Sequence, residues 1–560
     1  MSSIWLDQLQ SLRKQILSSS SALSAPSKDG FVKKITIIDS NKLADLSEWS
    51  KELHPTEFSD TCAQLYRILP DIVALKTDTD TRFSMLEQLH PIAMDACEGL
   101  RQLIFTDDSA LDASKREALV IIQAIHKQLY AGYLSCFIDQ CSRRKIKTSE
   151  IDSTTKAAGR ALYSAACIVR NAYSVYGSAP SKIWLGLHSI YQICSDLELQ
   201  FKSYEYDEHS NATCSLKGMY LAVTVLSAVR TNQLSARSIK RLFDYLLESS
   251  TQINAGDKDT SAALFWVDPL QDTGAHYAEP FGAHLEQPIS EHAYSLELSK
   301  LSKLIREAER ENSLPAQLTR HLLPILSKKP ERFDKRQALK RSGPGFGLSI
   351  AIGLSKIHQL LSDGQSFKTF VGTERNFVPK SDSPFSFEED DKLSNSTVAI
   401  EPDPQLSIVN KSDSGFCISW KGDIPGHLES GQIVAISDKT DLNSEQQNDS
   451  LYEIGVVRWV KRFKSSARIG IQIIARSARP AAVSQSFDMG GHSDFVRALL
   501  LPADHEGNTS FITTQSVVRP FSKVKLFDGV DESRASTDEC ILATSRARQF
   551  TYLLSNHDNE

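Results

Sequence analysis

The residues with the most specific chemical potential form a basic cluster beyond the middle of the chain. Between Arg320 and Arg341 there are eight Lys or Arg residues and two acidic ones, and Arg332 and Arg336 stand four positions apart within this cluster, as R-x-x-x-R. A guanidinium binds a phosphate through two parallel hydrogen bonds and can stack its plane on a base. The cluster therefore predicts a site for an anionic ligand. Two alternatives stay open, a solvated helix end with its linker, and contact with nucleic-acid phosphates.

A second polar group begins 74 residues after Arg336. Asn410, Ser412 and Gly415 form an N-x-S-x-x-G pattern directly before the strand-like run FCISW. An Asn side chain can bind the edge of a base, a Ser hydroxyl adds a hydrogen bond, and a Gly lets the backbone approach closely. The same residue types are common in ordinary turns, which is the alternative interpretation.

The two motifs, followed by the runs QIVAIS, IGVVRWV and IGIQII, resemble the PilZ family, bacterial receptors for the second messenger cyclic di-GMP. The resemblance covers roughly residues 330–480, and YSVYGSAPSKIWLGLHSIYQ resembles the N-terminal part of a group of long PilZ proteins. It implies a six-stranded barrel that binds cyclic di-GMP, a ligand with two phosphates and two guanines. By that resemblance, Arg332 and Arg336 bind phosphate and guanine, and Asn410, Ser412 and Gly415 form the opposing wall.

The spacing departs from the compact arrangement of that family. An acidic stretch accounts for much of the distance between the two motifs, and GPGFG, at Gly343–Gly347, separates the arginines from the first strand. A rival register, in which Lys340 and Arg341 follow Arg336 as the ligand-binding residues, therefore remains an alternative.

Other cysteines and histidines form no recognisable metal or catalytic site. Cys136 and Cys141 have the wrong spacing for a zinc site, and Cys136 falls on an apolar helix face. His126, His188 and His358 lie on helical patterns, so we expect packed or surface residues rather than catalytic bases. We therefore expect no metal.

Trp420 and Trp459 are expected to pack the barrel, with contact to a ligand as the alternative. The sequence contains no P-loop, G-x-S-x-G or H-E-x-x-H motif. We therefore expect no catalytic residue, no cofactor and no enzymatic activity.

Composition excludes several classes of protein. The 560 residues predict several domains, and a net charge of −6 argues against a surface built as a whole for nucleic acid. No run approaches 18 consecutive apolar residues, so no membrane span is expected, and MSSIWLDQLQSLRKQ lacks the order of a secretory signal. Nine scattered cysteines, an odd number, favour reduced thiols and a cytoplasmic location.

Periodicity changes near residue 345. The segment 58–328 is poor in Gly and Pro and predicts eight to ten helices; on one of them Leu119, Ile122, Ile125, Leu129, Tyr133 and Phe137 share an apolar face. Before the next, Ser178 could cap a helix that starts near Pro180. After residue 345, short β-branched runs separated by turn residues predict antiparallel strands of a small barrel.

The expected architecture is a multidomain α+β protein. It comprises a flexible segment 1–30 with a short amphipathic helix, an all-helical domain 31–328, a basic linker 329–345, a PilZ-like antiparallel barrel 346–480 and a β-rich extension 481–560. The barrel contains an acidic surface insertion at 363–404, with nine acidic and four basic residues, expected to be dispensable for the fold.

We expect a cytoplasmic receptor for cyclic di-GMP that acts through an unknown protein partner bound by the helical region. The competing interpretation is a scaffolding protein with a degenerate barrel that binds no nucleotide.

Overall fold

The computed structural model describes most of the chain, namely residues 4–20, 31–54, 56–106, 113–142, 147–207, 212–256, 264–277, 290–311, 313–327, 348–372, 405–412, 414–422, 424–425, 428–438, 452–463, 465–487, 491–503, 507–514, 518–544 and 546–555. The chain divides into two compact units. Unit 1 holds Met1–Thr231 and Ala236–Glu331, and unit 2 holds Asn232–Ser235 and Arg332–Glu560.

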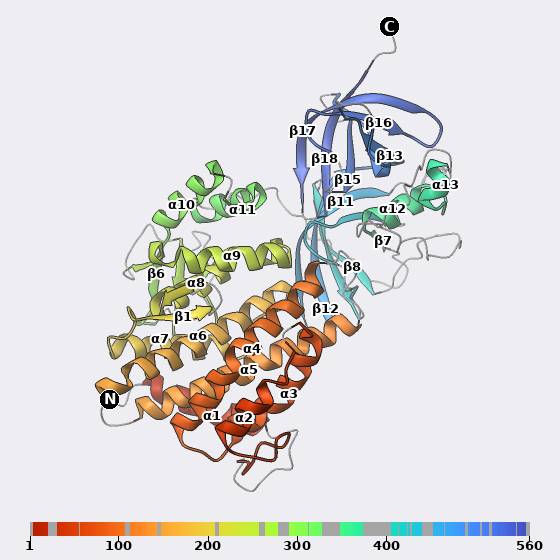
Figure 1. The fold of residues 1–560 in the computed structure, drawn as a ribbon. Coiled ribbons are helices and arrows are strands. Elements are labelled where there is room, and N and C mark those ends of the chain that lie inside the picture. The colour runs from red at the N-terminus through yellow and green to blue at the C-terminus, as the bar shows by residue number, and fades with distance from the viewer. Residues whose placement is uncertain are drawn as a thin grey trace. The chain divides into compact units, whose positions relative to one another are not determined.

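Unit 1 is built mainly from helices, as the sequence predicts. Its α-helices are α1 Ile4–Ser20, α2 Leu43–Ser50, α3 Phe58–Ala74, α4 Thr79–Thr106, α5 Ala113–Cys141, α6 Ile151–Ser174, α7 Ile183–Asp196, α8 Leu216–Ala228, α9 Ala236–Glu248, α10 Ser299–Arg310 and α11 Ala316–Ser327. The long helices α4, α5 and α6 pack side by side (Figure 1). On α5, five of the six residues predicted to share an apolar face are fully buried, and Leu119 is half-buried.

The prediction that the helical region contains helices alone is wrong between residues 203 and 297. Strands β1 Ser203–Asp207 and β2 Ala212–Ser215 form a hairpin, and β3 Asn254–Gly256, β4 Phe265–Val267, β5 His276–Tyr277 and β6 Tyr294–Glu297 form an antiparallel sheet in the order β3-β6-β4-β5. These strands have two to five residues, too few to establish a period of two in the sequence.

A buried hydrogen-bond chain ties this small sheet to the helices. His188 Nε2 lies 2.9 Å from the carbonyl oxygen of Thr273 and must donate to it, so Nδ1 accepts from the Tyr220 hydroxyl, at 2.7 Å. Tyr294, on β6, donates in turn to Tyr220, at 2.7 Å. Burial lowers the pKa of His188 to about 4, which keeps its ring neutral at neutral pH.

The prediction of a flexible segment over residues 1–30 is wrong for residues 4–20, which form a helix, whereas residues 1–3 and 21–30 lie outside the described residues. Helix α1 packs on α5 and α7, with Trp5, Leu9 and Leu12 buried. Arg13 adds an ion pair with Asp139 of α5. The amphipathic helix predicted there is therefore present, as a packed part of unit 1.

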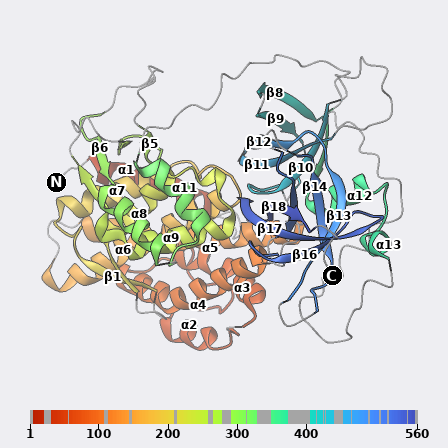
Figure 2. The same ribbon diagram turned by 90° about the horizontal axis from the view of Figure 1, so that it is seen from above.

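Unit 2 contains two antiparallel β-structures, which confirms the α+β class. Strands β7 Leu348–Ile352, β8 Leu406–Ser412, β9 Gly415–Lys421, β10 Ile433–Asp438, β11 Glu453–Arg462 and β12 Ser466–Ala475 form a six-stranded sheet in the order β7-β10-β11-β12-β9-β8. A closed barrel follows, β13-β14-β15-β18-β17-β16, from β13 Arg479–Gln485, β14 Val496–Leu501, β15 Ser510–Thr514, β16 Lys523–Phe527, β17 Glu532–Ala543 and β18 Ala547–Leu554. Figure 2 shows both β-structures from above.

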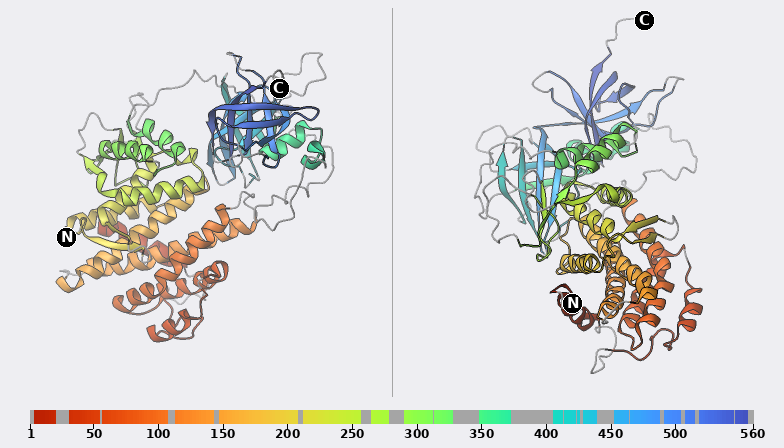
Figure 3. Two further views of the ribbon diagram at one scale, coloured as in Figure 1. Left: turned by 45° about the horizontal axis from the view of Figure 1, so that its top comes forward. Right: turned by 90° about the vertical axis from the view of Figure 1, so that its left-hand side faces the viewer.

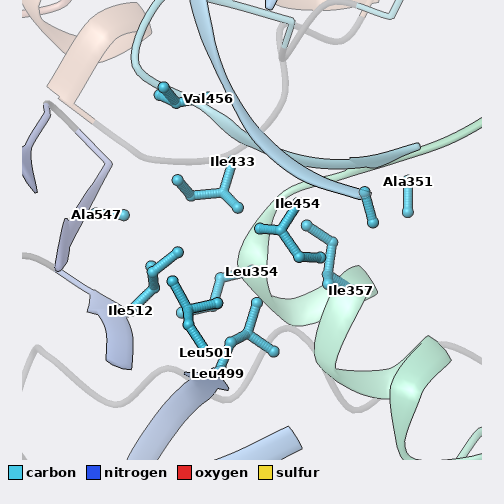
Figure 4. Packing of buried hydrophobic residues seen from close by; sticks show 11 residues of the cluster. Ala351, Leu354, Ile357, Ile433, Ile454, Val456, Leu499, Leu501, Ile512 and Ala547 are labelled. Carbon is cyan, nitrogen blue, oxygen red and sulfur yellow. The ribbon is translucent and has the colours of Figure 1, made fainter. Parts of the chain in front are cut away.

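The sheet and the closed barrel share one apolar core (Figure 4). Ile433 on β10 and Ile454 and Val456 on β11 pack with Leu499 and Ile512 of the barrel, all within about 1% of full burial. Burial of each such side chain contributes roughly 1.5–3 kcal/mol. The two β-structures of unit 2 therefore stabilise each other.

Two short helices pack on the β-structures of unit 2. Helix α12, Leu354–Leu361, follows β7 and adds Leu354 and Ile357 to the shared core. Helix α13, Phe367–Val371, lies beside the closed barrel (Figure 3). Val371 of α13 packs on Ala482, Phe495 and Phe527 in a separate apolar cluster. The prediction of a surface insertion from residue 363 is therefore wrong for residues 363–372. The rest of that stretch, 373–404, lies outside the described residues.

Within the described ranges, no helix is both long enough and apolar enough to span a membrane.

Candidate ligand-binding site

Strand register brings the predicted motif residues of β8 and β9 to one face of the six-stranded sheet. Directly paired residues of antiparallel strands point to the same side. One row across the sheet runs from Ser412 through Gly415 to Gln472, and the next runs from Asn410 through Cys417 and Gly470 to Trp459. We call the face formed by Asn410, Ser412, Gly415, Arg458, Trp459 and Gln472 the candidate face.

The opposite side of the same strands is the interior of the sheet. Phe416, Ile418, Ile469 and Ile471 alternate with the residues of the candidate face and are at most 3% exposed. Asn410 and Ser412 are half-buried, and Arg458 and Gln472 are exposed. The alternation of apolar and polar residues therefore leaves the candidate face as the side that solvent can reach.

The glycine of the N-x-S-x-x-G motif has a structural role in addition to any contact with a ligand. A Cβ atom built on Gly415 would overlap the carbonyl oxygen of Ile471 on β12. Only glycine lets β9 and β12 approach this closely at the start of the hairpin. The adjacent Ser412 hydroxyl lies 3.4 Å from the carbonyl oxygen of Gly415, to which it donates.

Trp459 lies across the sheet, over a second glycine. A Cβ atom on Gly470 would overlap Nε1 of the Trp459 indole, so the ring occupies the space that a larger residue would take. Trp459 is half-buried, whereas Trp420 is 6% exposed. The expectation of a packing role is confirmed for Trp420, and Trp459 packs over Gly470 with part of its ring exposed.

Arg458 occupies a bulge in β11, where the pairing with β12 shifts between Val457 and Trp459. Its Nε donates to Oε1 of Gln472 at 2.6 Å, and its carbonyl oxygen accepts from the Ser430 hydroxyl at 3.1 Å. Desolvation lowers the pKa of Arg458 from its ordinary value, which is high enough that a guanidinium stays charged at neutral pH.

The charge on this side of the sheet is positive. Lys461 and Arg468 are paired neighbours in the row next to Trp459, and both are exposed. Glu453, by contrast, lies 3.9 Å from Lys411 Nζ, which also stands over the Phe416 ring at 4.7 Å. Among the described residues of these rows, no carboxylate neutralises Lys461, Arg468 or Arg458. These positive charges therefore attract an anion to the candidate face.

The predicted residues fall into two groups. Asn410, Ser412 and Gly415 are brought together, as expected for one wall of a site. Arg332, Arg336, Lys340 and Arg341 lie outside the described residues, between α11 and β7. The prediction did not include Arg458 and Gln472 as site residues, although a charged residue beside a tryptophan in a strand was a usable signal.

The cysteine and histidines set aside as packing residues are packed. Cys136, His126, His188 and His358 are at most 2% exposed. Burial lowers the pKa of His126 to about 3 and that of His358 to about 4, so both are neutral at neutral pH. Among the residues that the structure describes, no cluster of three or more His, Cys, Asp or Glu side chains could hold a metal ion.

Three family models match successive parts of the chain. Residues 44–257 match the N-terminal domain of the cyclic-di-GMP receptor FimW, residues 378–480 match its middle PilZ domain, and residues 481–555 match its C-terminal β-barrel domain. The cyclic-di-GMP receptor FimW of Pseudomonas aeruginosa is 24% identical over 561 residues, an alignment that covers 91% of this chain and 90% of that protein. No solved structure matches.

The order of these matches is the order of the structural elements described above. The first falls on the helices of unit 1, the second ends with the six-stranded sheet, and the third covers the closed barrel. The chain is therefore a PilZ-domain protein with a long helical N-terminal region.

Proposed function

We propose that this chain is a receptor for cyclic di-GMP that works without catalysis. The observation that carries the proposal is the candidate face, where the N-x-S-x-x-G residues lie on the same side of the sheet as an aromatic ring and an exposed guanidinium. An aromatic ring provides a stacking surface for a purine, and a guanidinium binds phosphate. The similarity to a cyclic-di-GMP receptor over nine-tenths of the chain supports the same ligand.

In this proposal the ligand is held between two walls. Asn410 binds the edge of a guanine, Ser412 donates a further hydrogen bond, and Arg332 and Arg336 bind phosphate and guanine from the other side. Lys340 and Arg341 are the alternative pair. No cofactor or metal takes part, and nucleic acid is not a partner.

The output of the receptor is a change in protein contacts. The R-x-x-x-R segment connects the last helix of unit 1 to the first strand of unit 2, so a ligand that orders these arginines acts on the connection between the units. A ligand shifts such an equilibrium only by its difference in affinity for the two arrangements. We propose that unit 1 contacts a protein partner in the cytoplasm, and that the ligand changes this contact.

Isothermal titration calorimetry of the full chain with cyclic di-GMP tests the ligand. We expect saturable binding with a Kd in the micromolar range or tighter, weaker binding of cyclic di-AMP, and no binding of GTP. No heat of binding at high micromolar cyclic di-GMP would contradict the proposal and support a scaffold with a degenerate barrel.

Crosslinking in cells tests the partner. Proteins crosslinked to the full chain are compared with those crosslinked to its Arg336→Ala variant, which should fold but bind the ligand weakly. A partner whose yield changes with this substitution supports a ligand-dependent contact, and identical partner sets contradict it.

A further inference from the structure

We propose that Arg458, oriented by Gln472, is a third arginine of the ligand site and binds a phosphate of cyclic di-GMP. This inference rests on the proposed function. It concerns a residue outside the R-x-x-x-R and N-x-S-x-x-G motifs.

The bulge in β11 places both Arg458 and Trp459 on the candidate face, on the side of Val456 and its partner Gln472. In a regular strand Val457, Arg458 and Trp459 would alternate between the two sides of the sheet. Because the pairing with β12 shifts at this point, Arg458 is the extra residue, and its side chain reaches Gln472 on the same side as Trp459. The Ser430 hydroxyl holds the backbone of the bulge through the Arg458 carbonyl.

Gln472 fixes the orientation of the guanidinium and leaves its charge intact. The amide oxygen accepts from Nε at 2.6 Å, so the two terminal amino groups of Arg458 keep their donors for a ligand. Three other cations of this unit pair with carboxylates: Lys411 with Glu453, Lys525 with Glu532 and Arg546 with Glu429. Arg458 is held by a neutral group.

The position of Arg458 fits a phosphate rather than a base. Gln472 pairs directly with Gly415, whose neighbour across the hairpin is Ser412, so the guanidinium stands at the end of the row that carries the serine and the glycine. Asn410 and the Trp459 ring, the groups suited to a guanine, share the adjacent row. The guanidinium of Arg458 therefore lies next to the row that we propose to bind guanine, where the phosphate that joins two nucleosides would lie.

Calorimetry with two matched arginine variants tests the assignment. Arg458→Ala should raise the Kd for cyclic di-GMP at least about tenfold, which corresponds to about 1.4 kcal/mol. It should leave the ratio of the cyclic di-AMP and cyclic di-GMP affinities unchanged, because a phosphate is common to both. Arg534→Ala removes the same charge from an exposed position on β17 of the closed barrel, outside the candidate face, and should change the Kd less than about twofold, since salt screens exposed charges that lie away from the ligand. Thermal unfolding of both variants should match the parent chain, because both side chains are exposed.

Two substitutions of Gln472 test its positioning role. Gln472→Ala leaves the charge of Arg458 but removes its orientation, and should weaken binding while the dependence on ionic strength is retained. Gln472→Glu pairs Arg458 with a carboxylate and should weaken binding as much as Arg458→Ala does. If Gln472 had only a structural role, Gln472→Ala and Gln472→Glu would weaken binding to the same extent.

The outcomes separate this inference from the proposed function. If the parent chain does not bind cyclic di-GMP, the proposed function fails. If the parent binds and Arg458→Ala binds equally well, or if Arg458→Ala and Arg534→Ala weaken binding equally, the assignment of Arg458 is overturned. A loss of selectivity against cyclic di-AMP in Arg458→Ala would overturn the phosphate assignment in favour of base recognition.

Discussion

Gly415 of β9 faces the carbonyl oxygen of Ile471 on β12 at a separation that admits no Cβ atom. The obstacle is backbone, which cannot rotate away as a side chain can. We therefore expect Gly415→Ala to lower the free energy of unfolding by about 1–3 kcal/mol, the usual range for overpacking. Chemical denaturation of the full chain measures this. Ser414→Ala, at the adjacent exposed position, is the control and should stay within about 0.5 kcal/mol.

Gly470 meets a side chain instead, the Trp459 indole, and its substitution should have a different result. Gly470→Ala should displace the ring, change tryptophan fluorescence and weaken cyclic di-GMP binding, with a smaller loss of stability than Gly415→Ala because an indole can move. Unchanged fluorescence and unchanged affinity would show that Trp459 contributes only packing.

The register of the basic segment can be decided by binding measurements. We expect Arg336→Ala to weaken binding at least about tenfold, because charge-assisted hydrogen bonds contribute roughly 1.5–3 kcal/mol. Arg336→Lys should restore it only in part, since lysine lacks the planar fork. If Lys340→Ala and Arg341→Ala are the damaging substitutions and Arg332→Ala is silent, the rival register is correct.

Selectivity for guanine should depend on Asn410. Asn410→Ala should narrow the affinity gap between cyclic di-GMP and cyclic di-AMP, because the amide is proposed to contact the base edge, which differs between the two ligands. Ser412→Ala, on the same strand, is the comparison and should weaken both ligands alike. An unchanged ratio in Asn410→Ala would exclude the residue from base recognition.

The acidic stretch should divide at residue 372 into a part that the fold needs and a part that it does not. Replacing residues 374–402 by a Gly/Ser linker should leave the free energy of unfolding within about 0.5 kcal/mol. Removing α13 as well, by replacing residues 363–402, should cost at least about 2 kcal/mol, since it deletes the buried Val371 with Phe367 and Phe370 and uncovers their partners Ala482, Phe495 and Phe527. Equal stability of the two variants would contradict the packing role of α13.

Acid should destabilise unit 2 through His358. Its Nε2 donates to the Ala481 carbonyl oxygen at 3.1 Å, and burial, with a smaller effect of Arg497, lowers its pKa to about 4. Because the unfolded chain binds this proton near pH 6.5, the stabilisation is complete above that pH and is lost as the pH falls to about 4, by up to about 3 kcal/mol. The free energy of unfolding should depend less on pH between about 6.5 and 4 in the His358→Gln variant than in the parent chain. His492→Gln, at an exposed histidine of the same unit, should leave the profile unchanged.

The division into helices and antiparallel strands could be predicted from periodicity, because both halves contain long amphipathic or alternating runs. The apolar face of α5 is the clearest case. The start of α7 could not be predicted in this way. Ser178 was the expected cap, whereas the helix begins at Ile183 and its first amides, at Lys182 and Leu185, donate to Asp272. A cap supplied from 87 or more residues away leaves no local pattern.

The candidate site was predictable as far as its motifs reach. Asn410, Ser412 and Gly415 could be named because their order resembled a family pattern. Arg458 beside Trp459 left only a weak signal, and its contact with Gln472 could not be predicted, because it depends on the register between β11 and β12, which has no sequence signature. The packing of α13 could not be predicted for a similar reason, since the residues that Val371 contacts lie more than a hundred positions later in the sequence.

Strand β11 carries Ile454 and Val456 into the core shared with the closed barrel and, a few residues later, presents Arg458 and Trp459 on the candidate face. A fragment that ended at residue 480 would leave the first pair of side chains without its covering layer, and such a fragment should self-associate. The same dependence limits evolution by domain shuffling. The two β-structures can be exchanged between proteins only as a pair. We therefore expect related proteins that contain the closed barrel to contain the six-stranded sheet as well.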